Sequence, residues 1–283
     1  MTIAVTAVSG ALGAEIAKTL VALNTDETII GLARSPEKAQ GLGIEVRPGD
    51  YTDPVALEAS LQDVDTLLLV SGNTAPQDRI GQHRNVIKAA KAAGVKKIVY
   101  TSVQGAEEGT AFSPVIQSNR QTEADIRASG LEWVIGRNGI YIEPDIEYID
   151  TYIKTGEICN SAGEGRCGYT TRSELAYAYA QMLMDTAHNG QTYLLHGVPI
   201  TQSELTRYLS TAFGTELTYR PMTVQEYKAE RVSELGEFLG SIIAGIYQGI
   251  HDGALNEPSD FEAAAGRPHQ SWDSYFASVA QQK

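Results

Sequence analysis

Residues 6–13 decide the fold of this chain, and they read Thr6-Ala7-Val8-Ser9-Gly10-Ala11-Leu12-Gly13. They follow the apolar run Ile3-Ala4-Val5 and open a segment with a helical pattern. A strand that passes through a short glycine-bearing turn into a helix directs free backbone amides and the positive helix end toward one point. The stretch therefore predicts a site for the diphosphate of a dinucleotide, and a plain strand-to-helix turn without a ligand is the alternative.

The turn lacks one of the glycines that such sites usually carry. In the pattern Gly-x-x-Gly-x-x-Gly, Ala7 stands at the first glycine, whereas Gly10 and Gly13 are present. The first glycine serves the tight turn, the second lets the backbone approach phosphate, and the third lets the helix pack on the strand. We expect Ala7 to be tolerated if its φ is negative; otherwise it weakens or reshapes the site.

Short apolar, β-branched runs alternate with helical patterns through the first half of the chain. The predicted strands are residues 3–8, 28–33, 45–48, 66–70, 97–101 and 133–137. Continuous apolar runs such as Leu67-Leu68-Leu69-Val70 indicate strands that are buried on both faces. Gly94 and Gly130 stand where left-handed residues would end helices. We predict an α/β fold with a doubly wound, mostly parallel Rossmann sheet.

The pattern loosens after Arg137, and we predict a smaller, mainly helical C-terminal lobe. A helix over 172–185 and an apolar run at 192–196 indicate a return to the sheet as a late strand. Thr201 with Glu204, and Thr223 with Glu226, each fit a capping box at a helix start. A helix over 232–251 either covers the predicted crevice or packs on a second subunit. The predicted division is an NAD(P)-binding domain, residues 1–140 plus about 165–198, and a substrate-side lobe, residues 141–164 and 199–283.

Composition excludes several classes of protein. With 35 acidic against 22 basic residues, the formal charge is -13, which repels nucleic acid because no basic cluster occurs. No run approaches the about 18 apolar residues of a membrane span, and the N-terminus lacks secretory features. Cys159 and Cys167 have no histidine close in sequence, so we predict neither a disulfide framework nor a metal site. We expect a cytoplasmic protein that binds neither nucleic acid nor membrane; a homodimer is compatible with these features.

The end of the second predicted strand favours NADP(H) over NAD(H). An acid there would accept the ribose hydroxyls and repel a 2′-phosphate, but this chain has Arg34, 21 residues past Gly13, and Lys38 one helical turn further on. A guanidinium can bind the phosphate through two hydrogen bonds. Asp50, at the end of the third strand, either accepts from the adenine amino group or is an ordinary turn residue.

Four further stretches carry a resemblance to a known family. They are Arg34-Ser35-Pro36-Glu37-Lys38-Ala39, Gln82-His83-Arg84-Asn85-Val86-Ile87-Lys88-Ala89-Ala90-Lys91-Ala92-Ala93-Gly94-Val95-Lys96, Tyr100-Thr101-Ser102 and Arg137-Asn138-Gly139-Ile140-Tyr141. Together with the turn, they resemble the NmrA-like atypical short-chain dehydrogenases over almost the whole chain. Within that family, the similarity is to the bacterial NADPH-dependent quinone reductases of the type-2 class and to triphenylmethane reductase.

The resemblance implies the places of cofactor and substrate. It implies phosphate contacts at Thr6, Val8, Ser9, Gly10, Ala11 and Leu12, and 2′-phosphate contacts at Arg34 and Lys38. It implies that the nicotinamide lies near Ser71, Gly72, Asn73 and Asn138, and that the substrate lies beside Tyr141.

The familiar acid/base pair of short-chain dehydrogenases is absent from the sequence. No tyrosine stands four residues before a lysine, so alcohol oxidation and sugar epimerisation by that route are disfavoured. Reduction of a quinone does not require this acid/base pair, because hydride addition yields an aromatic oxyanion that water or a neutral donor can protonate. The candidates for polar contacts with the ligand are Ser102, Asn119, Asn138 and Tyr141. Alternatively, Ser102 is a strand-end cap, Asn119 and Asn138 are turn or helix-start residues, and Tyr141 is a packed aromatic. His83 is interpreted as a helix-surface or satisfied core side chain.

The leading hypothesis is an NAD(P)H-dependent reductase of a quinone or a similar small aromatic acceptor. The alternative is a non-catalytic NADP-binding, redox-sensing regulator of the NmrA type, which the missing acid/base pair and Ala7 fit equally well. A third hypothesis is a scaffold that has lost its cofactor.

Overall fold

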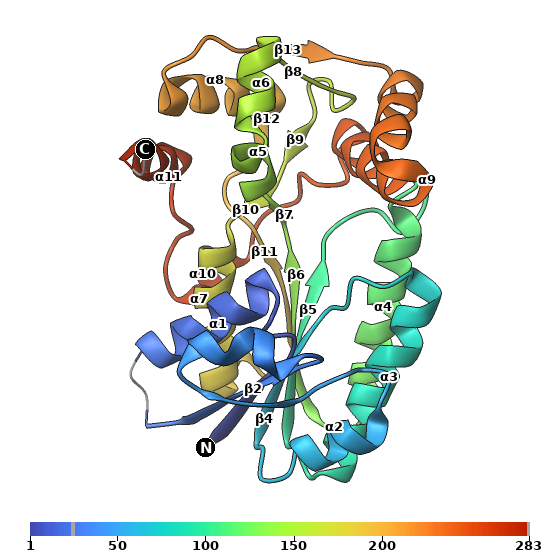
Figure 1. Cartoon of the computed structure of the whole chain (residues 1–283), viewed down its shortest axis with the longest axis vertical. Coiled ribbons are helices and arrows are strands. Elements are labelled where there is room, and N and C mark those ends of the chain that lie inside the picture. The colour runs from blue at the N-terminus through green and yellow to red at the C-terminus, as the bar shows by residue number, and fades with distance from the viewer. Residues whose placement is uncertain (24–25, 282–283) are drawn as a thin grey trace.

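The computed structural model describes residues 1–23 and 26–281, and its centre is a sheet of seven parallel strands (Figure 1). The strand order is β11-β6-β5-β4-β1-β2-β3. The strands are β1 (Thr2–Val5), β2 (Thr28–Ala33), β3 (Glu45–Pro48), β4 (Thr66–Val70), β5 (Lys97–Val103), β6 (Glu132–Asn138) and β11 (Gln191–Leu195). The order reverses at β1 and β4, which is the doubly wound Rossmann arrangement, so the predicted fold class is confirmed.

All six strands predicted in the first half are present, and so is the late strand, which pairs with β6. The first one ends earlier than predicted, at Val5 instead of Val8. The reason is that Ala7 takes a left-handed backbone conformation, with a φ of 53°, which an extended strand cannot contain. The turn therefore begins at Thr6.

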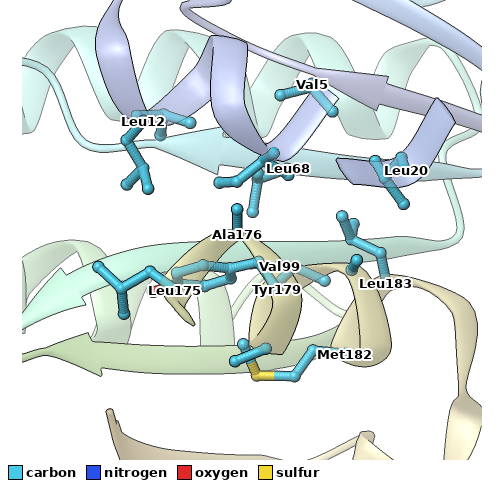
Figure 2. Packing of buried hydrophobic residues seen from close by; sticks show 14 of the residues in the cluster. Val5, Leu12, Leu20, Leu68, Val99, Leu175, Ala176, Tyr179, Met182 and Leu183 are labelled. Atoms are coloured by element: carbon cyan, nitrogen blue, oxygen red, sulfur yellow. The ribbon is translucent and has the colours of Figure 1, made fainter. Parts of the chain in front are cut away.

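Helices cover both faces of the sheet. On one face lie α1 (Ala11–Ala22), α7 (Arg172–Met184) and α10 (Phe261–Ala265); on the other lie α2 (Pro54–Ser60), α3 (Pro76–Ala92) and α4 (Ser113–Arg127). Figure 2 shows the first face, where Leu12 and Leu20 of α1 and Leu175 of α7 lie over Leu68 and Val99 of the strands. Each such fully buried side chain contributes about 1.5–3 kcal/mol to stability.

The residues that end these helices were largely readable from the sequence. Gly94 and Gly130 follow α3 and α4 with φ values of 81° and 83°, so the two predicted left-handed positions are confirmed. Pro54 begins α2 after Asp53, whose carboxylate accepts from the Ala56 amide at 3.0 Å. These ends set where each loop leaves the sheet.

A third apolar cluster lies beyond the carboxyl ends of the strands (Figure 1). Its elements are α5 (Glu143–Glu147), α6 (Ile149–Thr155), β8 (Glu157–Asn160), β9 (Arg166–Cys167), β12 (Ile200–Thr201), α8 (Gln202–Phe213), β13 (Thr218–Pro221), α9 (Val224–His251) and α11 (Trp272–Gln281). Short ladders join β8 to β13, β9 to β12, and β7 (Ile140–Tyr141) to β10 (Tyr169–Thr170). Two short 3₁₀ helices, η1 (Pro36–Leu42) and η2 (Thr186–His188), complete the chain.

Both capping boxes are confirmed. Thr201 and Glu204 satisfy each other's amides at the start of α8, and Thr223 and Glu226 do the same for α9. The helix predicted over 232–251 lies within α9, but α9 is interrupted inside that range, at Gly236, where φ is 80°. Among the described residues, no helix has the length and apolar character needed to cross a membrane.

Candidate cofactor and acceptor site

One cavity of about 980 Å³ runs along the carboxyl edge of the sheet. Its walls are the turns that follow β1 to β6, together with residues of α3, α4, α5, α7 and α9. In open α/β sheets, ligands bind in this crevice, at the point where the strand order reverses. The volume lies at the upper end of the usual range for ligand pockets, about 300–1,000 Å³, as a site for two ligands requires.

The turn after β1 forms one end of the cavity. Ser9, Ala11 and Leu12 line it, and the helix α1 begins at Gly10 without any side-chain cap and without an acidic residue in its first turn. The first amides of a helix have no partner within the helix, so an uncapped start can bind an anion. This donor set fits the diphosphate of a dinucleotide.

Ala7 occupies this turn in the left-handed conformation, so the condition under which we expected it to be tolerated, a negative φ, is not met. The conformation costs a residue with a Cβ about 1–2 kcal/mol. It persists because the surrounding backbone fixes it: the Gly10 amide donates to the Ala7 carbonyl at 2.9 Å, and the Val8 amide donates to Leu32 at 3.2 Å. Alanine at this position therefore holds strain in the loop.

Two of the residues implied for the phosphates face inward instead of lining the cavity. Thr6 is fully buried, and its hydroxyl accepts from the Val70 amide at 2.9 Å and lies 2.5 Å from the Tyr51 hydroxyl. Val8 is buried as well, at 1% exposure. Tyr51, which the sequence did not single out, joins the ends of three strands and itself lines the cavity.

Arg34 lines the cavity at the end of β2. Its side chain is exposed, and no carboxylate within the described chain forms an ion pair with it. Asp50 lines the cavity nearby, but its Oδ1 already accepts from the amide and hydroxyl of Thr52, which lower the pKa of Asp50. Lys38 is exposed on η1 and does not line the cavity. Arg34 is thus an exposed cation at the cavity wall that forms no ion pair within the described residues.

The loop after β4 is fixed from behind by a buried histidine. The Gly72 amide donates to Nε2 of His83 at 3.0 Å, so the ring hydrogen lies on Nδ1 and points to the Thr122 hydroxyl at 2.9 Å. Burial, aided by the charge of Arg79, lowers the pKa of His83 to about 3. The satisfied core role expected for His83 is confirmed, and the neutral ring holds Gly72 at the cavity wall.

The side-chain oxygen and nitrogen of Asn119 both form hydrogen bonds within the protein. Its Oδ1 accepts from Tyr100 at 2.6 Å and from Ser71 at 3.1 Å, and its amide nitrogen donates to the Val115 carbonyl at 2.8 Å. Burial raises the pKa of Tyr100 to about 12, so this phenol stays protonated. Ser71 is the member of this network whose hydroxyl is only partly buried at the cavity.

Ser102 is likewise bound into a buried charge network. Its hydroxyl donates to Glu123 at 2.7 Å, and the fully buried carboxylate of Glu123 also receives Arg120, Arg127 and Arg137 at 2.8 to 3.2 Å. Burial opposes ionisation, but the Arg137 hydrogen bond and the Arg120 charge outweigh it and hold the pKa of Glu123 below its ordinary value. The Ser102 hydroxyl hydrogen is therefore not available to a ligand.

The other end of the cavity is mostly apolar. Tyr141 and Asn138 lie here beside side chains of three helices and a strand: Phe112, Val115, Ile140, Pro144 and Ile246. The hydroxyl of Tyr179 lies 2.6 Å from Asn138 Oδ1 and so orients its amide. Burial raises the pKa of Tyr141, although a hydrogen bond with Asn138 opposes the shift. Ile246 brings α9 to the cavity.

Comparison with known proteins places this geometry in a family. A family model described as NAD(P)H-binding matches residues 8–186, which is more than half of the chain. The chain belongs to this NAD(P)H-binding family. It is 34% identical over 262 residues to quinone oxidoreductase 2 of Escherichia coli, and the alignment covers 91% of each chain.

Solved structures agree with that assignment. The crystal structure of the Escherichia coli NADPH-dependent quinone oxidoreductase with NADPH has a TM-score of 0.89 to this chain at 32% identity, covering 98% of this chain and 99% of the other. Triphenylmethane reductase of Citrobacter with NADP(H) has a TM-score of 0.88 at 33% identity, covering 99% of both chains. An NmrA-like domain oxidoreductase of Aspergillus flavus is 29% identical over 79% of this chain and 75% of its own length. The resemblance to NmrA-like reductases is confirmed.

The structure brings most of the predicted site residues to one cavity. Those that line it are Ser9, Ala11, Leu12, Arg34, Asp50, Ser71, Gly72, Asn73, Ser102, Asn119, Asn138 and Tyr141; Thr6, Val8, Gly10 and Lys38 do not. Sequence reasoning missed Tyr51, Arg79 and Arg172, which also line it. Nothing in a single sequence marks these three, because their place depends on which helix face or loop turns toward the crevice.

Proposed function

We propose that this chain transfers hydride from NADPH to a quinone or a similar small aromatic acceptor. The observation that carries the proposal is that one cavity joins an uncapped helix start and Arg34 to an apolar chamber that contains Tyr141. The relatives support it, since two of them are named for the reduction of quinones and triphenylmethane compounds with NADPH or NADP(H). NADP(H) supplies the hydride chemistry when bound.

The residues of the chain would bind and orient the two partners. The first amides of α1 hold the diphosphate, Arg34 binds the 2′-phosphate, and the loop at Ser71, Gly72 and Asn73 supports the nicotinamide side, with Asn138 beside it. The substrate lies against Tyr141 and the apolar wall, in the region we assign to the lobe of residues 141–164 and 199–283. Lys38 and Asp50 are secondary contacts at the adenosine end.

Tyr141 is the neutral donor of this site. Its raised pKa keeps the phenol protonated, and the hydrogen bond with Asn138 orients it. A protonated phenol can donate to an acceptor oxygen without serving as a base, which suits a quinone and does not suit an alcohol. The missing tyrosine–lysine pair thus agrees with the proposed reaction.

The direct test is turnover with a panel of small quinones, followed by the loss of nicotinamide absorbance. We expect turnover with NADPH to exceed that with NADH, and Arg34→Ala to lower the ratio of the two kcat/KM values about tenfold, since a charged hydrogen bond contributes about 1.5–3 kcal/mol. Lys38→Ala is the matched control and should change the ratio less than threefold.

The outcomes separate the candidate functions. Binding of NADPH without turnover of any quinone would favour the redox-sensing regulator. The absence of a thermal shift with either dinucleotide would favour a scaffold without cofactor. An Arg34→Ala variant with the wild-type preference would overturn the assignment of the 2′-phosphate site.

A further inference from the structure

Arg79, on the first turn of α3, is a buried cation without an acid. The residue is 7% exposed and lines the cavity. Nη2 donates to the Thr74 carbonyl at 3.0 Å, Nη1 reaches the Ser118 hydroxyl at 3.4 Å, and Nε has no hydrogen-bond partner. No carboxylate of residues 1–23 and 26–281 forms an ion pair with it.

Other largely buried arginines of this chain are paired. The side chains of Arg120 and Arg231 are both 14% exposed, and they lie 2.9 Å from Glu123 and 2.6 Å from Glu230, respectively. Only one carbonyl and one hydroxyl of the protein replace the water that the Arg79 guanidinium loses on burial, and burial lowers the pKa of Arg79. Guanidinium nevertheless stays protonated in proteins. A cavity-lining cation of this kind has unused capacity for an anion.

The contacts of Arg79 place it between the loop that we assign to the nicotinamide and the acceptor end of the cavity. Its contact Ser118 lies on α4 and donates to the Val115 carbonyl at 2.8 Å, and Val115 belongs to the apolar wall of the acceptor end. Its other contact, Thr74, ends the loop that begins at Ser71. The diphosphate and 2′-phosphate positions lie instead after β1 and β2, where α1 and Arg34 already supply donors.

We propose that Arg79 is a catalytic residue that binds the acceptor oxygen on which negative charge develops during reduction. The inference rests on the proposed function. Hydride carries one proton and two electrons: the carbon–hydrogen bond of the dihydronicotinamide breaks, a new bond to hydrogen forms on the quinone, and the electron pair comes to rest on a quinone oxygen. The hydroquinone anion then takes its second proton from water.

The overall charge of the chain favours such a group. At a formal charge of -13, the protein repels an anion formed in its interior. A fixed, largely buried guanidinium stabilises that anion more than it stabilises the neutral quinone, which is the condition for a faster chemical step.

The kinetic test compares Arg79→Met, Arg79→Lys and a control on the same helix, Arg84→Met. Arg84 lies outside the cavity and pairs with Asp125 at 2.6 Å. With 2-methyl-1,4-naphthoquinone, we expect Arg79→Met to lower kcat about 100-fold, the scale seen when one oxyanion donor is removed. Arg79→Lys should recover part of the loss, and Arg84→Met should match the wild type. Thermal melting of each variant checks that the fold is retained.

A second measurement needs no turnover. 4-Nitrophenol, added with NADP⁺ present, reports its ionisation by its phenolate absorbance. Arg79 should lower the pKa of the bound phenol by about one unit, a tenfold shift of the equilibrium, and Arg79→Met should abolish the shift. This result would support the anion site even if no quinone were reduced, so it separates this inference from the proposed function.

Two results would overturn the inference. The first is a loss of NADPH affinity in Arg79→Met that matches the loss of kcat/KM, because Arg79 would then belong to the cofactor. The second is unchanged ionisation of bound 4-nitrophenol in Arg79→Met and Arg79→Lys, with both variants folded.

Discussion

Gly13→Ala tests whether the first helix must lie against the first strand for the cofactor turn to form. A Cβ at Gly13 would lie 2.5 Å from the Ala7 carbonyl oxygen, 2.8 Å from the Ala7 carbonyl carbon and 2.9 Å from the Thr6 oxygen. These are backbone atoms, so relief requires α1 to move away from the turn. Gly10→Ala is the matched control, because its Cβ would meet only the Ala7 oxygen, at 3.3 Å.

The magnitude follows from these contacts. Overpacking of this kind costs about 1–3 kcal/mol, and three backbone contacts place it at the upper end. Alanine recovers up to about 1 kcal/mol of helix propensity, which leaves a net loss of about 2 kcal/mol. With an unfolding entropy of about 2.1 cal/mol/K per residue, the melting temperature should fall by about 3–4 °C. Gly10→Ala should cost about 1 kcal/mol or less.

The assay is thermal melting with and without NADPH, combined with titration of NADPH binding. We expect Gly13→Ala to lower the melting temperature and to weaken NADPH binding at least tenfold, because displacement of α1 moves the amides of its first turn. Equal melting temperatures and equal NADPH affinities for the Gly13 and Gly10 variants would refute the reasoning, since the two contacts would then be energetically alike.

Three further predictions concern strain and buried charge. Ala7→Gly should raise the free energy of unfolding, measured in urea, by up to about 1 kcal/mol. The variant loses about 1–2 kcal/mol of left-handed backbone strain, and this gain exceeds the cost of about 0.4–1 kcal/mol from the greater entropy of the unfolded chain. A decrease in the free energy of unfolding would show that Ala7 is unstrained. Glu123→Gln should lower the free energy of unfolding, measured in urea at pH 7, by about 3 kcal/mol, because Arg120 and Arg137 lose their countercharge. A loss no larger than that of Ser102→Ala would contradict the stabilising role of the charge network around Glu123. Burial raises the pKa of Asp145 to about 6. Between about pH 4 and 6 the native state therefore binds more protons than the unfolded chain, and the free energy of unfolding falls as the pH rises through that interval. Asp145→Asn should therefore stabilise the protein by about 3 kcal/mol at pH 8 and by nothing near pH 4, and a pH-independent difference in urea would argue against this.

The strands could be predicted because burial on both faces requires a continuous run of apolar residues, which is visible in the sequence. Leu67-Leu68-Leu69-Val70 needs no distant information to be identified as a central strand, and the glycines after α3 and α4 mark helix ends by their own conformational freedom. The capping boxes are equally local, since donor and acceptor stand three residues apart.

The candidate site was predicted less completely. Its place after a strand identified Arg34, the family resemblance implied Ser71 and Asn138, and the structure brings all three to one cavity. Ser102 also stands after the core of a strand, yet its hydroxyl is bound to Glu123, 21 residues further along the chain. A single sequence does not contain that pairing.

By itself, the sequence determined that a glycine-bearing turn joins the first strand of a parallel α/β sheet to a helix and that a cation follows the second strand, because these features depend on neighbouring residues. The tertiary structure decided the conformation of Ala7, the tautomer of His83 and the isolation of Arg79. The physical reason is that strain, protonation and unpaired charge depend on which groups share a buried space. In this chain such groups come from distant elements; His83 and Thr122, for example, are 39 residues apart.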